Sequence, residues 1–178
     1  MQQDSTALVT GGGRGIGQAI CVELARRGAD IFIADLNADE MQETVELVEA
    51  EGGSARALET DVTDFKSVES TVEIALEEFD SVDWLVNNAG IAGPTAPCEA
   101  IDSDEWDATL DVNLRGAFYT CRTLIPSMKA QSYGRIVNIA SVTGKRPLTQ
   151  RTPYAAAKMG LIGFTRTLAA EVGDRNIN

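Results

Sequence analysis

The chain has 178 residues, of which 44% are hydrophobic, and its 27 acidic and 15 basic residues give a net charge of -12. This length predicts one domain with a sizeable core, and a charge this negative repels phosphate backbones and anionic lipids, so neither nucleic acid nor a membrane is an expected partner. The sequence contains no histidine, which excludes His-based triads and most zinc sites. Any chemistry must therefore use Tyr, Lys, Ser, Asn, carboxylates or a cofactor, and we expect no metal.

The cysteines and the start of the chain indicate a compartment. Cys21, Cys98 and Cys121 lie far apart without a C-x-x-C pair, as is typical of a reducing environment. Residues 1–4 lead straight toward the first strand, without a basic and then apolar leader, and no run reaches the ~18 apolar residues of a membrane span. We expect a cytoplasmic protein.

Short apolar runs predict the strands. They are nearly continuous in apolar residues rather than alternating, which favours a parallel sheet covered on both faces. The runs are 7–9, 31–33, 84–86 and 136–139, with a weaker one at 55–58.

Longer stretches with an apolar residue at about every fourth position predict the helices between these strands. We expect them at 15–27 before Gly28, at 38–51 behind an Asn37 cap, at 64–79, from Asp102 with Glu105 completing a capping box, at 114–130 and at 155–172. The order β-α-β-α-β-α-β-α-α-β-α predicts a doubly wound, Rossmann-like α/β domain with three α/β/α layers over residues 1–178. Loops 91–101 and 142–153 leave the carboxyl ends of strands, where such sheets bind ligands.

A glycine-rich loop, Thr10-Gly11-Gly12-Gly13-Arg14-Gly15-Ile16-Gly17, follows the first strand and opens the first helix. Glycines allow a sharp turn and a close approach to a pyrophosphate, whose charge is stabilised at the helix N-terminus. The loop therefore predicts dinucleotide binding, the alternative being a tight turn that binds nothing.

Asp35 ends the second strand, 18 residues after Gly17. A carboxylate at this position accepts hydrogen bonds from ribose hydroxyls and repels a 2′-phosphate, so it favours NAD. Arg14 argues in the other direction, because a guanidinium can hold a phosphate. We expect NAD, with NADP as the less favoured cofactor.

Together these residues resemble a known family. The glycine loop, the run Asn87-Asn88-Ala89-Gly90, Ser141, and Tyr154 with Lys158 are similar in order and spacing to the motifs of the short-chain dehydrogenases/reductases. The resemblance covers essentially the whole chain and implies an NAD(P)-dependent oxidoreductase that acts on CH–OH groups.

Tyr154 and Lys158 are four residues apart, so their side chains share one helix face. A phenol ionises near pH 10, and acid/base work near neutrality requires about 3–4 kcal/mol of phenolate stabilisation. Lys158 can supply this as a nearby cation. The resemblance implies that Ser141 hydrogen-bonds the substrate oxygen, and that Asn113 bends a helix and holds a water that leads protons to the lysine.

The resemblance also implies cofactor contacts. Asp61 and Val62 would flank the adenine, residues 88–90 would line the nucleotide channel, and Lys158 would bond the nicotinamide ribose. The residues expected at the cofactor are Gly11, Arg14, Gly15, Ile16, Gly17, Asp35, Leu36, Asp61, Val62, Asn88, Ala89, Gly90, Tyr154 and Lys158.

The loop between Ser141 and Tyr154 carries three cations within seven residues, Lys145, Arg146 and Arg151, and no acid. One hypothesis is that Arg146 or Arg151, or Lys145, binds an anionic group of the substrate such as a carboxylate or phosphate. The alternative is a solvated loop or a subunit contact.

The chain departs from the family at residues 176–178, where a sixth strand would start. The later strands and the substrate lid of the family are missing, so we expect a C-terminally incomplete domain.

The leading hypothesis is an NAD-dependent oxidoreductase that interconverts a secondary alcohol and a ketone. The alternatives are an NADPH-dependent 3-oxoacyl-thioester (acyl-carrier-protein) reductase and a non-catalytic dinucleotide-binding module or inactive fragment. The resemblance implies a homodimer or homotetramer that pairs its two longest helices.

Overall fold

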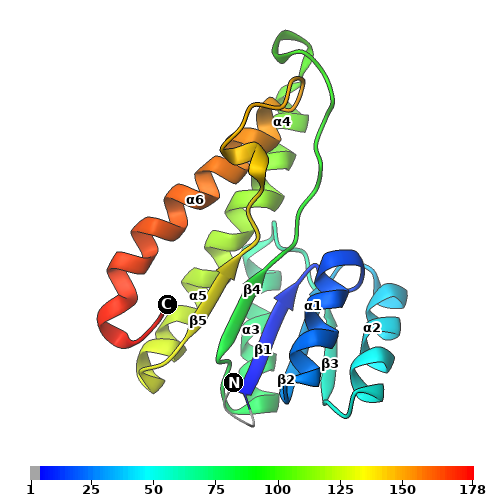
Figure 1. Cartoon of the computed structure of the whole chain (residues 1–178), viewed down its shortest axis with the longest axis vertical. Helices are drawn as coiled ribbons and strands as arrows, with labels where there is room; N and C mark the ends of the chain where they lie inside the picture. The colour runs from blue at the N-terminus through cyan, green and yellow to red at the C-terminus, as the bar shows by residue number, and fades with distance from the viewer. Residues whose placement is uncertain (1–4) are drawn as a thin grey trace.

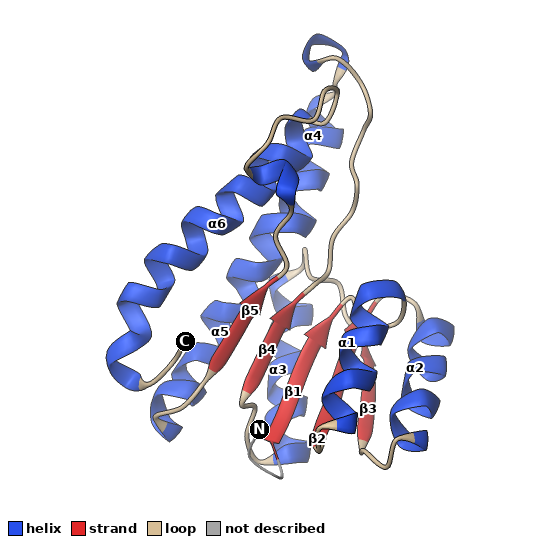
Figure 2. Ribbon diagram, in the orientation of Figure 1, coloured by secondary structure: helices blue, strands red, loops and turns tan. Residues whose placement is uncertain are grey.

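The structure is a computed structural model that describes residues 5–178. The segment 1–4, in which we expect no leader, lies outside the described residues. A five-stranded parallel sheet forms the centre, in the order β3-β2-β1-β4-β5, and all strands point the same way (Figure 2). The strands are β1 (Ser5–Thr10), β2 (Ala29–Asp35), β3 (Ala55–Glu59), β4 (Trp84–Asn87) and β5 (Arg135–Asn138).

Within residues 5–178, six α-helices connect and extend the strands (Figure 1). They are α1 (Gly15–Arg26), α2 (Ala38–Ala50), α3 (Phe65–Phe79), α4 (Ser103–Leu110), α5 (Gly116–Gln131) and α6 (Thr152–Val172). This order confirms the predicted doubly wound, Rossmann-like α/β fold.

Local signals place most helix ends where the sequence predicts them. Gly28, with φ +85°, follows α1, and the side chain of Asn37 accepts hydrogen bonds from the first turn of α2. Two helix starts differ from the prediction by two or three residues. The predicted helix 155–172 begins earlier, at Thr152, because Pro153 is tolerated in a first turn that needs no donor. The predicted helix 114–130 begins only at Gly116, because a π-helical segment (Asp111–Arg115) joins it to α4.

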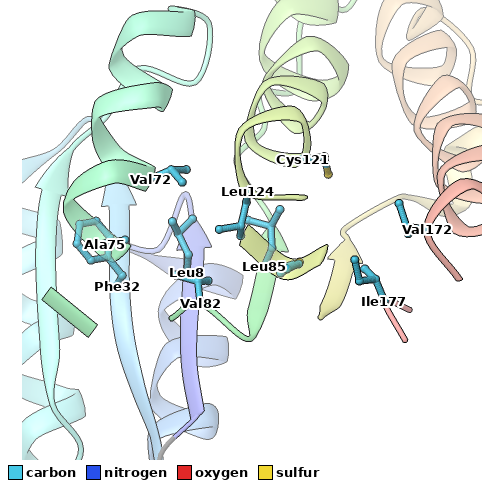
Figure 3. Packing of buried hydrophobic residues seen from close by; sticks show 11 residues of the cluster. Leu8, Phe32, Val72, Ala75, Val82, Leu85, Cys121, Leu124, Val172 and Ile177 are labelled. Carbon is cyan, nitrogen blue, oxygen red and sulfur yellow. The ribbon is translucent and has the colours of Figure 1, made fainter. Parts of the chain in front are cut away.

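The two faces of the sheet have separate cores. Helices α1 and α2 cover one face, with Cys21 and Val48 packed against β1 and β2. Helices α3, α5 and α6 cover the other, where Leu124 of α5 packs in one cluster with residues of the central strands (Figure 3). Burial raises the pKa of Cys21 and of Cys121 to about 12, so both thiols are neutral core groups.

The edge strand β5 continues its pairing into the last residues. Ile177 pairs in parallel with Gly134, and the Ile136 N–H donates to the Asn178 carbonyl at 2.7 Å. Val137 on β5 is 41% exposed. Residues 177–178 thus occupy the position predicted for the start of a sixth strand.

Candidate active site

A cleft of about 1080 Å³ lies at the carboxyl ends of the strands, between the glycine loop and the N-terminal half of α6. It brings together residues that are up to about 150 positions apart in the sequence, and nearly all the residues singled out from the sequence line it. These are Gly11, Arg14, Gly15, Ile16, Asp35, Leu36, Asp61, Val62, Asn88, Ala89, Gly90, Asn113, Ser141, Arg151, Tyr154 and Lys158. Gly17 and Arg146 do not line it.

The glycine loop needs glycine for two different reasons. Gly11 has φ +63°, and a Cβ there would lie 2.8 Å from the Ala89 Cα, while a Cβ on Gly17 would collide with the Gly11 carbonyl oxygen. Gly15 also has a positive φ, +56°, but no atom lies within 4 Å of the place its Cβ would take. The loop is therefore closely packed at Gly11 and Gly17 but open at Gly15, at the N-terminus of α1. This open position fits a pyrophosphate group.

Residues after β4 hold the glycine loop in place through hydrogen bonds. The Asn88 side-chain amide donates to the Gly11 carbonyl at 2.8 Å, and the Thr10 hydroxyl accepts from the backbone N–H groups of Asn88 and Ala89, both at 3.1 Å. The loop after β4 and the glycine loop thus form one rigid wall of the cleft.

Asp35 is fixed at the end of β2. Its Oδ2 accepts from the Gly13 N–H at 2.9 Å, and its Oδ1 accepts from the Leu36 N–H at 2.7 Å. Arg14, the next residue of the loop after Gly13, is paired with Glu40 at 3.4 Å. The fixed carboxylate matches the geometry expected for a ribose-binding residue.

The wall next to β3 contains Asp61 and Val62. The Asp61 carboxylate accepts from the N–H and the hydroxyl of Thr63, at 2.8 and 2.7 Å, and is thereby oriented within its turn. Val62 packs so closely on α5 that a Cβ on Gly116 would lie 2.9 Å from it.

Tyr154 and Lys158 lie on one face of α6, and the Lys158 Nζ is 5.7 Å from the centre of the Tyr154 ring. Lys158 is only 4% exposed, and its Nζ donates to the Ile139 carbonyl at 2.8 Å. Because burial disfavours the charged ammonium, the pKa of Lys158 is lowered from its ordinary value. The lysine is held as a buried group behind the phenol.

Asn113 lies in the π-helical segment, and its amide donates to the carbonyls of Ile91 and Thr109, both at 2.9 Å. Within residues 5–178, its buried Oδ1 has no hydrogen-bond partner. A cavity of about 10 Å³ borders both Asn113 and Lys158, which is about the size of one water molecule. This geometry fits a water held between the two side chains.

Ser141 follows β5 and opens a 3-10 turn (Val142–Gly144), where its Oγ accepts from the Thr143 N–H at 3.2 Å. The side chain is half-buried and lines the cleft together with Tyr154.

The three cations of the 142–153 loop lie in different places. Arg151 lines the cleft, and its Nη1 donates to the carbonyls of Ala92 and Gly93, at 2.9 and 3.1 Å, which ties the two long loops together. Arg146 is exposed outside the cleft, and Lys145 lines a neighbouring hollow beside β5. An anion-binding role for these residues stays a prediction, and Arg151 is the cation of the three that faces the cleft.

Sequence reasoning missed the residues that act through their backbone or through distant partners. The Ile139 carbonyl that holds Lys158 has no side-chain signal, and Glu40 is one of several acidic residues on its helix, so nothing in the sequence singles it out. The other missed lining residues are Ala34, Asn37, Thr60, Ile91, Ala92, Val112, Ala140, Thr143 and Leu148. Three of them, Asn37, Thr60 and Ala140, lie one or two residues after the end of a strand, and this position is the signal that points to them.

Among residues 5–178, no helix is both long enough and apolar enough to span a bilayer.

The chain is similar to known proteins over nearly its whole length. A family model described as short chain dehydrogenase matches residues 5–178. The short-chain reductase protein NovJ of Streptomyces niveus is 40% identical over 177 residues, which are 99% of this chain and 67% of the relative. Levodione reductase of Leifsonia aquatica is 38% identical over 172 residues, which are 96% of this chain and 64% of the relative.

Among solved structures, NAD+-bound xylitol dehydrogenase superposes with a TM-score of 0.97 at 34% identity, over 99% of this chain and 68% of that one. The chain thus spans about two thirds of the length of the proteins it matches.

Proposed function

Because the chain belongs to the short-chain dehydrogenase/reductase family, we propose that its cleft binds NAD and interconverts a secondary alcohol and a ketone. One observation carries the proposal: Tyr154 and the buried Lys158 lie in the same cleft as the glycine loop and Asp35. The similar proteins include reductases and a dehydrogenase by name, which supports the reaction class.

The residues around the cleft fit a dinucleotide. The open side of Gly15 at the α1 N-terminus holds the pyrophosphate, Asp35 binds the adenosine ribose, and Asp61 with Val62 flanks the adenine. Residues 88–90 line the channel toward the nicotinamide end, where Lys158 bonds the second ribose. When bound, the cofactor supplies or accepts the hydride.

Tyr154 and the side chains around it transfer the proton of the substrate hydroxyl. In oxidation, the Tyr154 phenolate takes the proton of the substrate hydroxyl, and Ser141 donates a hydrogen bond to the substrate oxygen. Lys158 stabilises the phenolate as a cation. Asn113 holds a water through its unpaired Oδ1, and this water passes protons between Lys158 and the solvent.

The preference for NAD over NADP rests on charge. The Asp35 carboxylate is fixed by two backbone N–H groups and faces the same end of the cleft as Leu36. It accepts hydrogen bonds from ribose hydroxyls and repels a phosphate at the same place.

Arg14 favours a second candidate, an NADPH-dependent 3-oxoacyl-thioester reductase, because its guanidinium is exposed beside the glycine loop. The pairing of Arg14 with Glu40 weighs against it. The non-catalytic module is disfavoured by the presence of Asn113, Ser141, Tyr154 and Lys158 in one cleft.

We further propose a single domain in the cytoplasm that forms a homodimer or homotetramer through α5 and α6. Phe118 on α5 is 42% exposed and Met159 on α6 is 53% exposed, and such apolar side chains are typical of helix–helix interfaces. Light scattering of the purified chain measures its mass in solution, and a monomer at all concentrations contradicts this assembly.

Parallel fluorescence titrations with NADH and NADPH test the proposed cofactor. We expect saturable binding of both, with NADH clearly tighter, and then NAD-dependent oxidation in a screen of secondary alcohols. Tighter NADPH binding replaces the leading function by the 3-oxoacyl reductase. Binding of neither dinucleotide contradicts every catalytic function considered for the chain.

A further inference from the structure

Glu40 lies beside the glycine loop because the first turn of α2 packs against that loop. One helical turn later, the buried Thr44 hydroxyl lies 2.9 Å from the Gly13 carbonyl oxygen and 3.1 Å from that of Gly12. A Cβ built on Gly13 would lie 3.1 Å from both the Glu40 Cβ and the Asp35 Oδ2. Glu40 and Asp35 therefore flank the same point of the loop from two different elements.

From this position Glu40 reaches Arg14. The two side chains meet at 3.4 Å, where Arg14 is 79% exposed and Glu40 is 33% exposed. Among the described residues that line the cleft along β1, β2, α1 and α2, Arg14 is the only cation. A 2′-phosphate bound at this end therefore has no other cationic side chain on these elements to pair with.

We propose that Glu40 determines cofactor specificity by holding the Arg14 guanidinium, so that it is withheld from the 2′-phosphate of NADP. The proposal rests on the proposed function, since it requires a dinucleotide in the cleft. Asp35 and Glu40 then both favour NAD over NADP, in different ways. Asp35 repels the 2′-phosphate, and Glu40 forms an ion pair with Arg14, the side chain on these elements that would attract that phosphate.

The energetic balance makes Glu40 a specificity residue rather than a stability residue. An ion pair between exposed side chains contributes only about 0–1 kcal/mol to folding, so removing it leaves the fold intact. A free guanidinium instead binds a phosphate through charged, bidentate hydrogen bonds. The consequence of losing Glu40 is therefore expected in ligand choice.

The test is Glu40→Gln, which keeps the shape of the side chain and removes its charge. Dissociation constants for NADH and NADPH are measured by fluorescence titration at low and high salt. We expect NADPH to bind about three- to fivefold tighter than to the wild type, which corresponds to the upper end of what an exposed ion pair contributes, and NADH to change by less than about twofold. The variant still binds NADH more tightly than NADPH, but by a smaller ratio of dissociation constants, because Asp35 still repels the 2′-phosphate. In 1 M salt the gain falls below about twofold, because the Debye length is only about 3 Å.

Two further variants identify the route of the effect. Arg14→Ala in the Glu40→Gln background removes the gain, because the freed guanidinium is then absent. Glu49→Gln changes the same charge on the same helix, about 13 Å farther along its axis, and leaves the NADH/NADPH ratio unchanged.

Each other outcome overturns the proposal in a different way. An unchanged ratio in Glu40→Gln, or an equal gain for both dinucleotides, means that Glu40 does not select the cofactor. A gain that survives Arg14→Ala means that it does not act through Arg14. If the wild type binds neither dinucleotide, the proposed function fails, and the inference fails with it. In the other two outcomes the wild type still binds a dinucleotide, so only the role of Glu40 is refuted.

Discussion

The Asn138 side-chain amide donates a 2.8 Å hydrogen bond to the Thr165 hydroxyl, and this bond connects the edge strand β5 to α6. The Asn138 Oδ1 in turn accepts from the Asn87 amide at 2.8 Å, and the Asn87 Oδ1 accepts from the Thr120 hydroxyl at 2.6 Å. A chain of polar side chains thus runs from α5 through β4 and β5 to α6. Because α6 carries the proposed proton-transfer residues, this chain fixes their position relative to the sheet.

The first prediction concerns this connection. Thr165→Val keeps the shape of the side chain but leaves the Asn138 amide without its acceptor, so we expect a loss of about 1–3 kcal/mol in the free energy of unfolding. Urea denaturation measures it. Thr123→Val is the matched control: both hydroxyls donate to a carbonyl four residues earlier in their own helix, at 2.7 Å for Thr165 and 2.9 Å for Thr123. Equal losses in the two variants would show that the bond to Asn138 contributes nothing.

The second prediction concerns Tyr154. Tyr154→Phe keeps the ring and removes the proton-transferring hydroxyl, so we expect kcat for secondary-alcohol oxidation to fall by about 10²- to 10⁴-fold. NADH binding, measured by fluorescence, should stay within about twofold. The rate is followed by NADH absorbance with the best alcohol from a screen. A variant that retains more than about a tenth of the wild-type rate contradicts the assignment of Tyr154.

The third prediction follows from the buried ammonium of Lys158. Its pKa is lowered in the folded state, so the unfolded chain binds more protons between that pKa and the ordinary value of 10.5. The contribution of Lys158 to stability is therefore fully present above pH 10.5 and is lost as the pH falls through the lowered pKa.

The free energy of unfolding of the wild type minus that of Lys158→Met isolates this contribution, because other titrating groups cancel. We expect the difference to rise with pH up to about 10.5, with a slope of at most about 1.4 kcal/mol per pH unit. Denaturant titrations at a series of pH values measure it. A difference that is independent of pH, or that falls as the pH rises, refutes the lowered pKa.

The fourth prediction separates the backbone role of a glycine from its role in binding. Gly15 and Gly28 both have positive φ, +56° and +85°, and no atom lies within 4 Å of the Cβ position of either. Alanine at either position should cost about 1 kcal/mol of folding free energy through backbone strain. Only Gly15 lines the cleft, so Gly15→Ala should also weaken NADH binding by at least about tenfold.

Thermal unfolding and NADH titration of the two alanine variants check this. Unchanged NADH binding in Gly15→Ala, or equal weakening in Gly28→Ala, would mean that the open side of the loop does not receive the cofactor.

The sequence by itself determined the order of the elements and most of the residues that line the cleft. The signals are local. Apolar runs predict buried parallel strands, Asn37 and Gly28 mark helix ends, and the glycine spacing of residues 10–17 predicts a turn that opens a helix. A parallel sheet collects whatever follows its strands at one edge, so Asp35, Asn88 and Ser141 could be assigned to one site before their distances were known.

Only the tertiary structure decided which groups support these residues. The Ile139 carbonyl that holds Lys158, the Thr165 hydroxyl that meets Asn138, and Glu40 beside Arg14 each depend on how a helix packs against the sheet or a neighbouring helix. The resemblance implies a bend at Asn113, but its form as a π-helical segment between α4 and α5 is seen only in the structure. The physical reason is that backbone carbonyls and exposed carboxylates occur throughout any sequence. Their partners are selected by packing across long sequence separations, which no local pattern encodes.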